Sequence, residues 1–157
     1  MLNVGDRAPA FERTSDTGEI VRLSQFAGKR VLLYFYPRAG TSGCTQQACA
    51  LRDLHPDIDD DELVVIGVSP DSPDTLAGFR AKYDLPFILL SDPDHAVAAA
   101  YGAWGTKSMA GKTYEGILRT HVAIDAAGRI TDYDLKVKPL DTATLARHLI
   151  QEGGSTR

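Results

Sequence analysis

Short apolar runs alternate with helical patterns along the middle of the chain. Three runs, rich in β-branched and aromatic residues, are typical of strands buried on both faces of a sheet: Val31–Tyr36, Leu63–Val68 and Phe87–Leu90. Apolar residues recur at helical spacing after Cys44. Ser72-Pro73 and Asp92-Pro93 each have the form of a helix start, a capping side chain followed by proline. We therefore expect strands and helices in alternation.

A predicted β-hairpin stands on each side of this alternation. The first pairs Phe11–Thr14 with Ile20–Leu23 across a turn that ends in Gly18. The second pairs Thr120–Ile124 with Ile130–Val137. Alternating strands and helices followed by a hairpin indicate a mixed sheet with helices on both faces.

The pattern at the end of the chain predicts a helix of about Thr142–Gln151, with Asp141 as its cap and residues 152–157 as a frayed tail. No linker or repeat interrupts the 157 residues, a length suited to one hydrophobic core. We therefore predict a single α/β domain over residues 1–157.

Charge and composition argue against several functions. The net charge of −4 provides no basic surface for nucleic acid, and no apolar run is long enough to cross a membrane. The first residues, Met1–Asp6, lack the basic and apolar segments of a secretory signal. We therefore expect a cytoplasmic protein, in which two cysteines are catalytic or redox-active rather than a structural bridge.

Both cysteines follow the first buried strand. Cys44 lies where a turn of proline, glycine and hydroxyl residues passes into a helix. Backbone N–H groups and the helix dipole stabilise an anion there, which favours the nucleophilic thiolate. Thr41 is placed to donate its hydroxyl to the thiolate or to a bound oxygen ligand, and Pro37 to shield the site from water. The residues alone leave open that Cys44 is a small buried apolar residue and Thr41 a simple helix cap.

Cys49 follows Cys44 by five positions. On an ideal helix this spacing separates the two Cα atoms by roughly 8–9 Å, beyond the span of about 7 Å that a disulfide tolerates without backbone movement. A bond between them would therefore require part of the helix to unwind. The spacing differs from Cys-x-x-Cys, and no histidine cluster completes a zinc site, which argues against metal binding. An inert Cys49 is the remaining alternative.

Several motifs resemble one family. Pro37-x-x-x-Thr41-x-x-Cys44 matches the active-site motif of peroxiredoxins, and the run from Tyr34 to Cys49 is similar to the PrxQ or bacterioferritin comigratory protein (BCP) subfamily. Further similar stretches cover nearly the whole chain: Gly5–Phe11, Phe79–Phe87, Leu90–Pro93, Tyr101–Gly105 and Arg119-Thr120. The resemblance implies a thioredoxin-like fold with an N-terminal β-hairpin extension.

The resemblance also implies a role for each matching residue. It makes Cys44 the peroxidatic cysteine and Cys49 the resolving cysteine, with Pro37, Thr41 and Arg119 framing the peroxide. Arg119 would place a permanent cation beside the thiolate. In such a thiol peroxidase, Cys44 is oxidised by hydrogen peroxide or an organic hydroperoxide and forms an intramolecular disulfide with Cys49, which thioredoxin or a glutaredoxin-like protein reduces. A monomer or weak homodimer without metal or organic cofactor is implied.

Some residues depart from the subfamily pattern. Arg38-Ala39-Gly40 replaces a common acidic pair, and Gln46 takes a place often held by lysine, so the charge around the site differs. His121 faces the same way as Arg119 on a strand, where the family usually has serine or threonine. We expect a satisfied or partly exposed histidine there, with a contact to the site as the alternative.

Two other functions are alternatives to a peroxidase. A thiol–disulfide oxidoreductase acting on protein disulfides normally carries Cys-x-x-Cys, which is missing here. A non-catalytic binding or holdase module with a degenerate site is disfavoured, because the proline, threonine, cysteine and arginine of the motif are all present.

Overall fold

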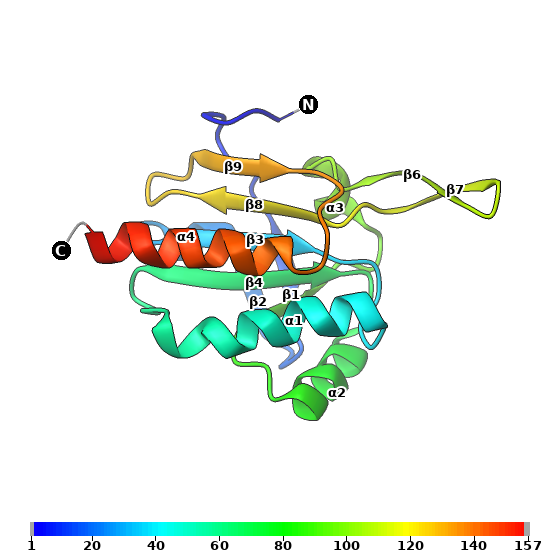
Figure 1. Ribbon diagram of the computed structural model, residues 1–157, viewed down its shortest axis with the longest axis horizontal. Coiled ribbons are helices and arrows are strands. Elements are labelled where there is room, and N and C mark those ends of the chain that lie inside the picture. Colours follow the sequence, from blue (N-terminus) through cyan, green and yellow to red (C-terminus); the bar gives the residue numbers. More distant parts are fainter. Residues whose placement is uncertain (1, 156–157) are drawn as a thin grey trace.

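The computed structural model describes residues 2–155, and their side chains through residue 152. Its centre is a five-stranded sheet of order β5-β4-β3-β8-β9 (Figure 1). The middle strand, β3 (Arg30–Phe35), is parallel to β4 (Leu63–Ser69) and antiparallel to β8 (Thr120–Ile124). The edges are β5 (Ile88–Ser91) and β9 (Ile130–Asp134). The predicted mixed sheet is therefore confirmed.

Two hydrophobic clusters, one on each face, explain the apolar run in β3. Alternate residues of a strand point to opposite faces, so Leu32 and Tyr34 belong to one cluster and Leu33 and Phe35 to the other. The helices on the first face are α1 (Ser42–Leu54), α2 (Pro73–Tyr83) and α4 (Asp141–Ser155). In Figure 1, α1 and α4 run side by side across this face. Among residues 2–155, no helix is long and apolar enough to span a membrane.

The opposite face is covered by the N-terminal hairpin and a short helix. The hairpin pairs β1 (Glu12–Thr14) with β2 (Ile20–Arg22), as predicted, and the 3-10 turn η1 (Leu23–Phe26) follows it. The short helix is α3 (Ala96–Ala100). Phe11, Val21, Val97 and Ala98 pack together in the cluster of this face. Helices on both faces are therefore confirmed. A second 3-10 turn, η2 (His55–Asp57), follows α1.

A second hairpin was not predicted from the sequence. It pairs β6 (Trp104–Met109) with β7 (Lys112–Ile117) and projects away from the sheet (Figure 1). Most of its residues are exposed, so neither strand carries a continuous apolar pattern. The available signal was the two-residue connection Ala110-Gly111, whose φ angles of 52° and 80° suit the turn that joins paired strands.

Three element ends differ from the sequence prediction. β9 ends at Asp134 rather than Val137, because Lys136 adopts a left-handed φ of 57° that interrupts an extended strand. α3 begins at Ala96, several residues after Pro93, and the Asp92 carboxylate accepts hydrogen bonds from its first turn. The predicted end of the last helix is also wrong: α4 includes residues 152–155, and 156–157 lie outside the described residues.

Candidate active site

Cys44 is the third residue of α1 and is 1% exposed. It shares the core-facing side of the helix with Ala48 and Leu51, as the helical spacing predicted. The first helical hydrogen bond runs from the Thr45 N–H to the Thr41 carbonyl, at 2.8 Å. The backbone N–H groups that precede it in the first turn have no hydrogen-bond partner within the helix. They are therefore available to stabilise an anion at the start of α1. The position is suited to a thiolate.

The loop before α1 is fastened to the end of β4. The Tyr36 N–H donates to the Val68 carbonyl at 3.1 Å. The Asp71 carboxylate, just beyond β4, accepts from the Ala39 N–H and the Ser69 hydroxyl, both at 2.7 Å. Pro37 is half-buried between these anchors. These contacts fix the place where α1 begins.

Arg119 reaches Cys44 from the residue before β8. Its Nη2 donates to Cys44 Sγ at 3.4 Å, and its Nη1 donates to Gln47 Oε1 at 2.5 Å. The Val137 N–H holds the Arg119 carbonyl at 2.8 Å. Gly43 makes room for the guanidinium, since a Cβ there would lie 3.1 Å from Arg119 Nη2. The structure thus brings together the cysteine and the arginine that the sequence motifs singled out.

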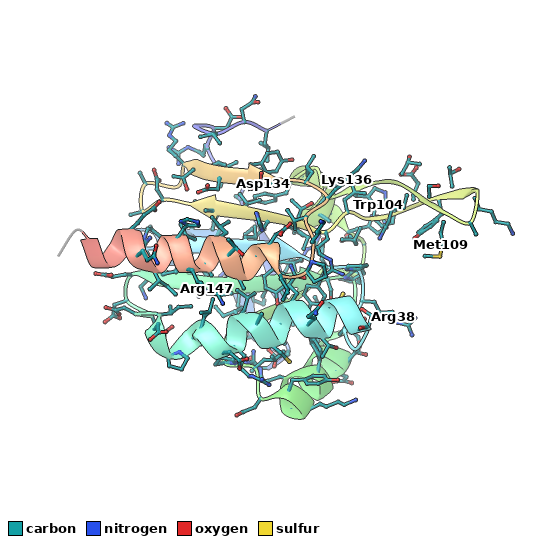
Figure 2. The ribbon with its side chains drawn as sticks, viewed as in Figure 1. Arg38, Trp104, Met109, Asp134, Lys136 and Arg147 are labelled. Atoms are coloured by element: carbon teal, nitrogen blue, oxygen red, sulfur yellow. The ribbon has the colours of Figure 1, made fainter. Side chains whose placement is uncertain are left out.

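Thr41 does not contact Cys44 through its hydroxyl in this structure. The side chain is exposed, and its Oγ1 donates to the Arg38 carbonyl at 2.9 Å. Thr41 is the N-cap residue of α1, as one interpretation of the sequence had it, but it caps through its backbone carbonyl and makes no side-chain capping bond. The Arg38 side chain points away from the sheet beside the first turn of α1 (Figure 2).

Cys49 lies in the following turn of α1 and is half-buried. Both cysteines are free thiols, and α1 is a continuous helix from Ser42 to Leu54. The structure therefore represents the reduced, fully wound state of this helix.

A buried polar chain behind Arg119 was not anticipated. Gln47 Nε2 donates to Thr142 Oγ1 at 2.9 Å, and Thr142 Oγ1 lies 3.1 Å from His121 Nδ1. His121 Nε2 lies 3.0 Å from Asp134 Oδ2. His121 is therefore a satisfied, buried histidine, connected to Arg119 through the side chains of Thr142 and Gln47. Gln47 could have been suspected, because it lies three residues after Cys44 on the same side of a helix.

Two tyrosines of the core lie beneath this site. Tyr34 and Tyr36 are each 1% exposed and stack with ring centroids 5.4 Å apart. Burial raises the pKa of both phenols above their ordinary value. Both therefore stay neutral at physiological pH and add no negative charge that would oppose a thiolate on Cys44.

The arrangement can perform nucleophilic sulfur chemistry. A buried thiol at a helix start, with an arginine 3.4 Å from its sulfur, can attack an electrophilic atom while nearby donors stabilise the departing anion. Within the part of the chain that the structure describes, no three His, Cys, Asp or Glu side chains gather where they could hold a metal ion.

Known proteins resemble this chain both in sequence and in fold. The AhpC/TSA family profile matches residues 4–133. The putative peroxiredoxin bcp of Haemophilus influenzae is 50% identical over 140 residues, which cover 89% of this chain and 90% of that protein. Peroxiredoxin Bcp of Escherichia coli K12 is 50% identical over 129 residues, or 82% of this chain and 83% of that protein.

Solved structures agree with the sequence relatives. A mutant of Xylella fastidiosa PrxQ superposes with a TM-score of 0.89 at 26% identity and covers 98% of each chain. Peroxidoxin BcpB of Mycobacterium tuberculosis superposes with a TM-score of 0.83 at 30% identity, over 97% of this chain and 98% of that one. The thioredoxin-like fold is thereby confirmed. The chain belongs to the AhpC/TSA family and is a peroxiredoxin, a thiol peroxidase, of the PrxQ/BCP subfamily.

Proposed function

We propose that this peroxiredoxin reduces hydrogen peroxide and organic hydroperoxides with Cys44 and resolves the oxidised Cys44 with Cys49 of the same chain. Thioredoxin, or a glutaredoxin-like protein, then reduces the disulfide. The observation that carries the proposal is the contact of 3.4 Å between Arg119 Nη2 and Cys44 Sγ, in a helix that holds a second free thiol.

In the first step, the Cys44 thiolate attacks one peroxide oxygen in line with the O–O bond. That bond breaks, its electron pair leaves on the other oxygen, and this oxygen takes up a proton as water or an alcohol. Cys44 becomes a sulfenic acid. Arg119 and the N–H groups of the first turn stabilise the charge on the departing oxygen. Rotation about one bond would turn the Thr41 hydroxyl from the Arg38 carbonyl to the peroxide, and Pro37 limits the approach of water.

In the second step, the Cys49 thiolate attacks the Cys44 sulfur. An S–S bond forms, and the sulfenic oxygen leaves as water after taking up a proton. Because an intact helix separates the two residues too far for this bond, the first turns of α1 must unwind. Leu51, which is fully buried beyond Cys49, holds the rest of the helix on the sheet while this happens.

In the third step, a dithiol protein attacks the disulfide by exchange and returns both cysteines to thiols. The peroxide thereby receives two electrons from the dithiol. An intrachain disulfide needs no second subunit, which supports a monomer or weak homodimer. We place the reaction in the cytoplasm, as part of antioxidant defence and redox homeostasis.

Stopped-flow oxidation tests the proposal with the full chain and the variants Cys44→Ser and Cys49→Ser. We expect Cys44→Ser to consume no peroxide, and Cys49→Ser to consume one equivalent without recycling by thioredoxin. Mass spectrometry of the oxidised wild type should show a monomer with a Cys44–Cys49 disulfide. Wild-type oxidation no faster than that of free cysteine would refute a peroxidase that uses Cys44. Full recycling of Cys49→Ser by thioredoxin would refute the resolving role.

A further inference from the structure

We propose that Thr142, His121 and Asp134 act as positioning residues for Arg119, by fixing which end of the Gln47 amide faces the guanidinium. The inference rests on the proposed use of Cys44 as the nucleophile. Its basis is the chain of contacts that runs from the end of β9, where Asp134 lies (Figure 2), through the start of α4 to α1.

The direction of the hydrogen bonds follows from the Asp134 end. A carboxylate only accepts, so the proton of His121 lies on Nε2, 3.0 Å from Asp134 Oδ2. In the neutral imidazole, Nδ1 is then an acceptor. The Thr142 hydroxyl has one proton, and it donates this proton to His121 Nδ1 across 3.1 Å.

The Thr142 oxygen therefore presents a lone pair to Gln47. Gln47 must turn its Nε2 toward that oxygen, at 2.9 Å, which directs its Oε1 to Arg119 Nη1 at the other end. The reverse orientation would place an NH₂ group against guanidinium N–H groups, two donors without an acceptor. Gln47 and Thr142 are fully buried, and His121 is 4% exposed. Water does not substitute easily there, and an unpaired buried group costs about 1–3 kcal/mol.

The orientation of the Gln47 amide affects Cys44 through the position of the Arg119 guanidinium. Arg119 is half-buried, and among the described residues its guanidinium has hydrogen bonds to Gln47 and Cys44. With the Gln47 oxygen in place, the guanidinium is held on two sides. When that oxygen turns away, the long arginine side chain is free to move toward solvent, and the cation leaves the sulfur.

The test compares two substitutions of one residue. Thr142→Val removes the hydroxyl at nearly constant shape, and Thr142→Ser retains it. We expect the second-order rate constant for Cys44 oxidation by hydrogen peroxide to fall about tenfold or more in Thr142→Val and to stay within about twofold of wild type in Thr142→Ser. Thr144→Val is the matched control, because Thr144 is exposed on the same helix and its hydroxyl donates to the Leu140 carbonyl of its own helix end rather than to the buried polar side chains. Thermal unfolding establishes that each variant is folded.

A double-variant cycle separates positioning from general damage. If Gln47 and Thr142 act through the same series of hydrogen bonds, the double variant Gln47→Leu/Thr142→Val should be oxidised little more slowly than Gln47→Leu alone. Three outcomes would overturn the proposal. The rate losses of the two single variants could multiply in the double variant, folded Thr142→Val could be oxidised at the wild-type rate, or Thr142→Val and Thr142→Ser could lose the same factor in rate. Wild-type oxidation no faster than free cysteine would instead mean that the proposed function has failed.

Asp134→Asn decides the matter if Thr142→Val does not fold. Its side chain is 62% exposed, so the substitution leaves the core intact. An amide can accept from His121 Nε2 or donate to it, so the substitution no longer holds the proton at Nε2, and the Thr142 hydroxyl is no longer required to donate to Nδ1. We expect a severalfold slower oxidation of Cys44; an unchanged rate would overturn the proposal.

Discussion

Cys44 and Cys49 stand five positions apart in one helix, yet their surroundings differ. Cys44 is buried in the first turn, where backbone N–H groups are free of the helical ladder and Arg119 touches the sulfur. Cys49 is half-buried in the next turn, three residues before Arg52, whose guanidinium is bound to Asp53 and to the Tyr83 carbonyl. Position, rather than residue type, makes one of two thiols suited to attack a peroxide.

The two halves of α1 are also held by different forces. The first half is attached through polar contacts of Cys44 and Gln47 with Arg119, and only the small side chains of Cys44 and Ala48 pack from it into the core. The second half is attached by Leu51, which is fully buried, and by the hydrogen bond from Arg52 to Tyr83. A helix anchored in this way can open at its start while its end stays in place. Substitutions in each half can therefore be expected to have different effects.

Leu51→Ala should have the largest effect, on the second half. Removing a fully buried leucine side chain leaves a cavity and lowers the free energy of unfolding by about 2–5 kcal/mol. Urea denaturation measures the loss. Leu140→Ala, at a position 51% exposed, is the control and should change stability little. A small loss for Leu51→Ala would show that packing does not hold the second half.

Arg119→Leu tests what distinguishes Cys44 from Cys49. Removing the cation should slow the oxidation of Cys44 by hydrogen peroxide about 10²–10³-fold, comparable to the loss of one strong oxyanion donor. The rate is measured by stopped flow in the Cys49→Ser background. Arg129→Leu is the control, because Arg129 lies in the connection between β8 and β9, at the opposite end of β8 from Arg119. An unchanged rate would assign the reactivity of Cys44 to the helix start alone.

Gly43→Ala probes the space beside Arg119. The new Cβ would lie 3.1 Å from Arg119 Nη2 and 3.3 Å from Pro139 Cγ, so the guanidinium must shift. We expect about tenfold slower oxidation of Cys44, or about 1.4 kcal/mol in the barrier. Gly78→Ala in α2, whose Cβ meets nothing within 4 Å, should leave the rate unchanged and add about 0.5–1 kcal/mol of stability. Equal rates in both variants would contradict the tight fit at Gly43.

Arg52→Ala should have the smallest effect. It removes the hydrogen bond of 2.9 Å to the Tyr83 carbonyl, worth about 0.5–1.5 kcal/mol in a typical case. Denaturation should show this loss, and the rate of disulfide formation should change little, because the proposed opening is confined to the first half of α1. A large change in that rate would contradict the division of α1 into two halves.

The hydrophobic pattern predicted the buried strands well, because residues enclosed on both faces must be apolar throughout. It did not predict the β6–β7 hairpin, most of whose residues are exposed. The end of β9 depended on one left-handed residue, Lys136, that no local pattern announces.

The candidate site was predicted in two stages. Spacing and helix position alone singled out Cys44 and the need for unwinding, whereas Arg119 entered only through the resemblance to peroxiredoxins. Gln47, Thr142 and His121 come from α1, α4 and β8, and their side chains meet only because those elements pack together. No local sequence pattern predicts such a tertiary contact.

The Asp71 anchor has a consequence for how the enzyme resets. Starting a helix from coil is the costly event, because several residues must be ordered before the first hydrogen bond is gained, whereas lengthening an existing helix is nearly free of that penalty. Asp71 keeps the loop before α1 fastened to β4, and Leu51 keeps the distal turns formed. In the proposed cycle, the opened segment therefore reforms after reduction by extending turns that stayed helical, toward a start that Asp71 holds in place, and recovery of the site avoids the nucleation barrier.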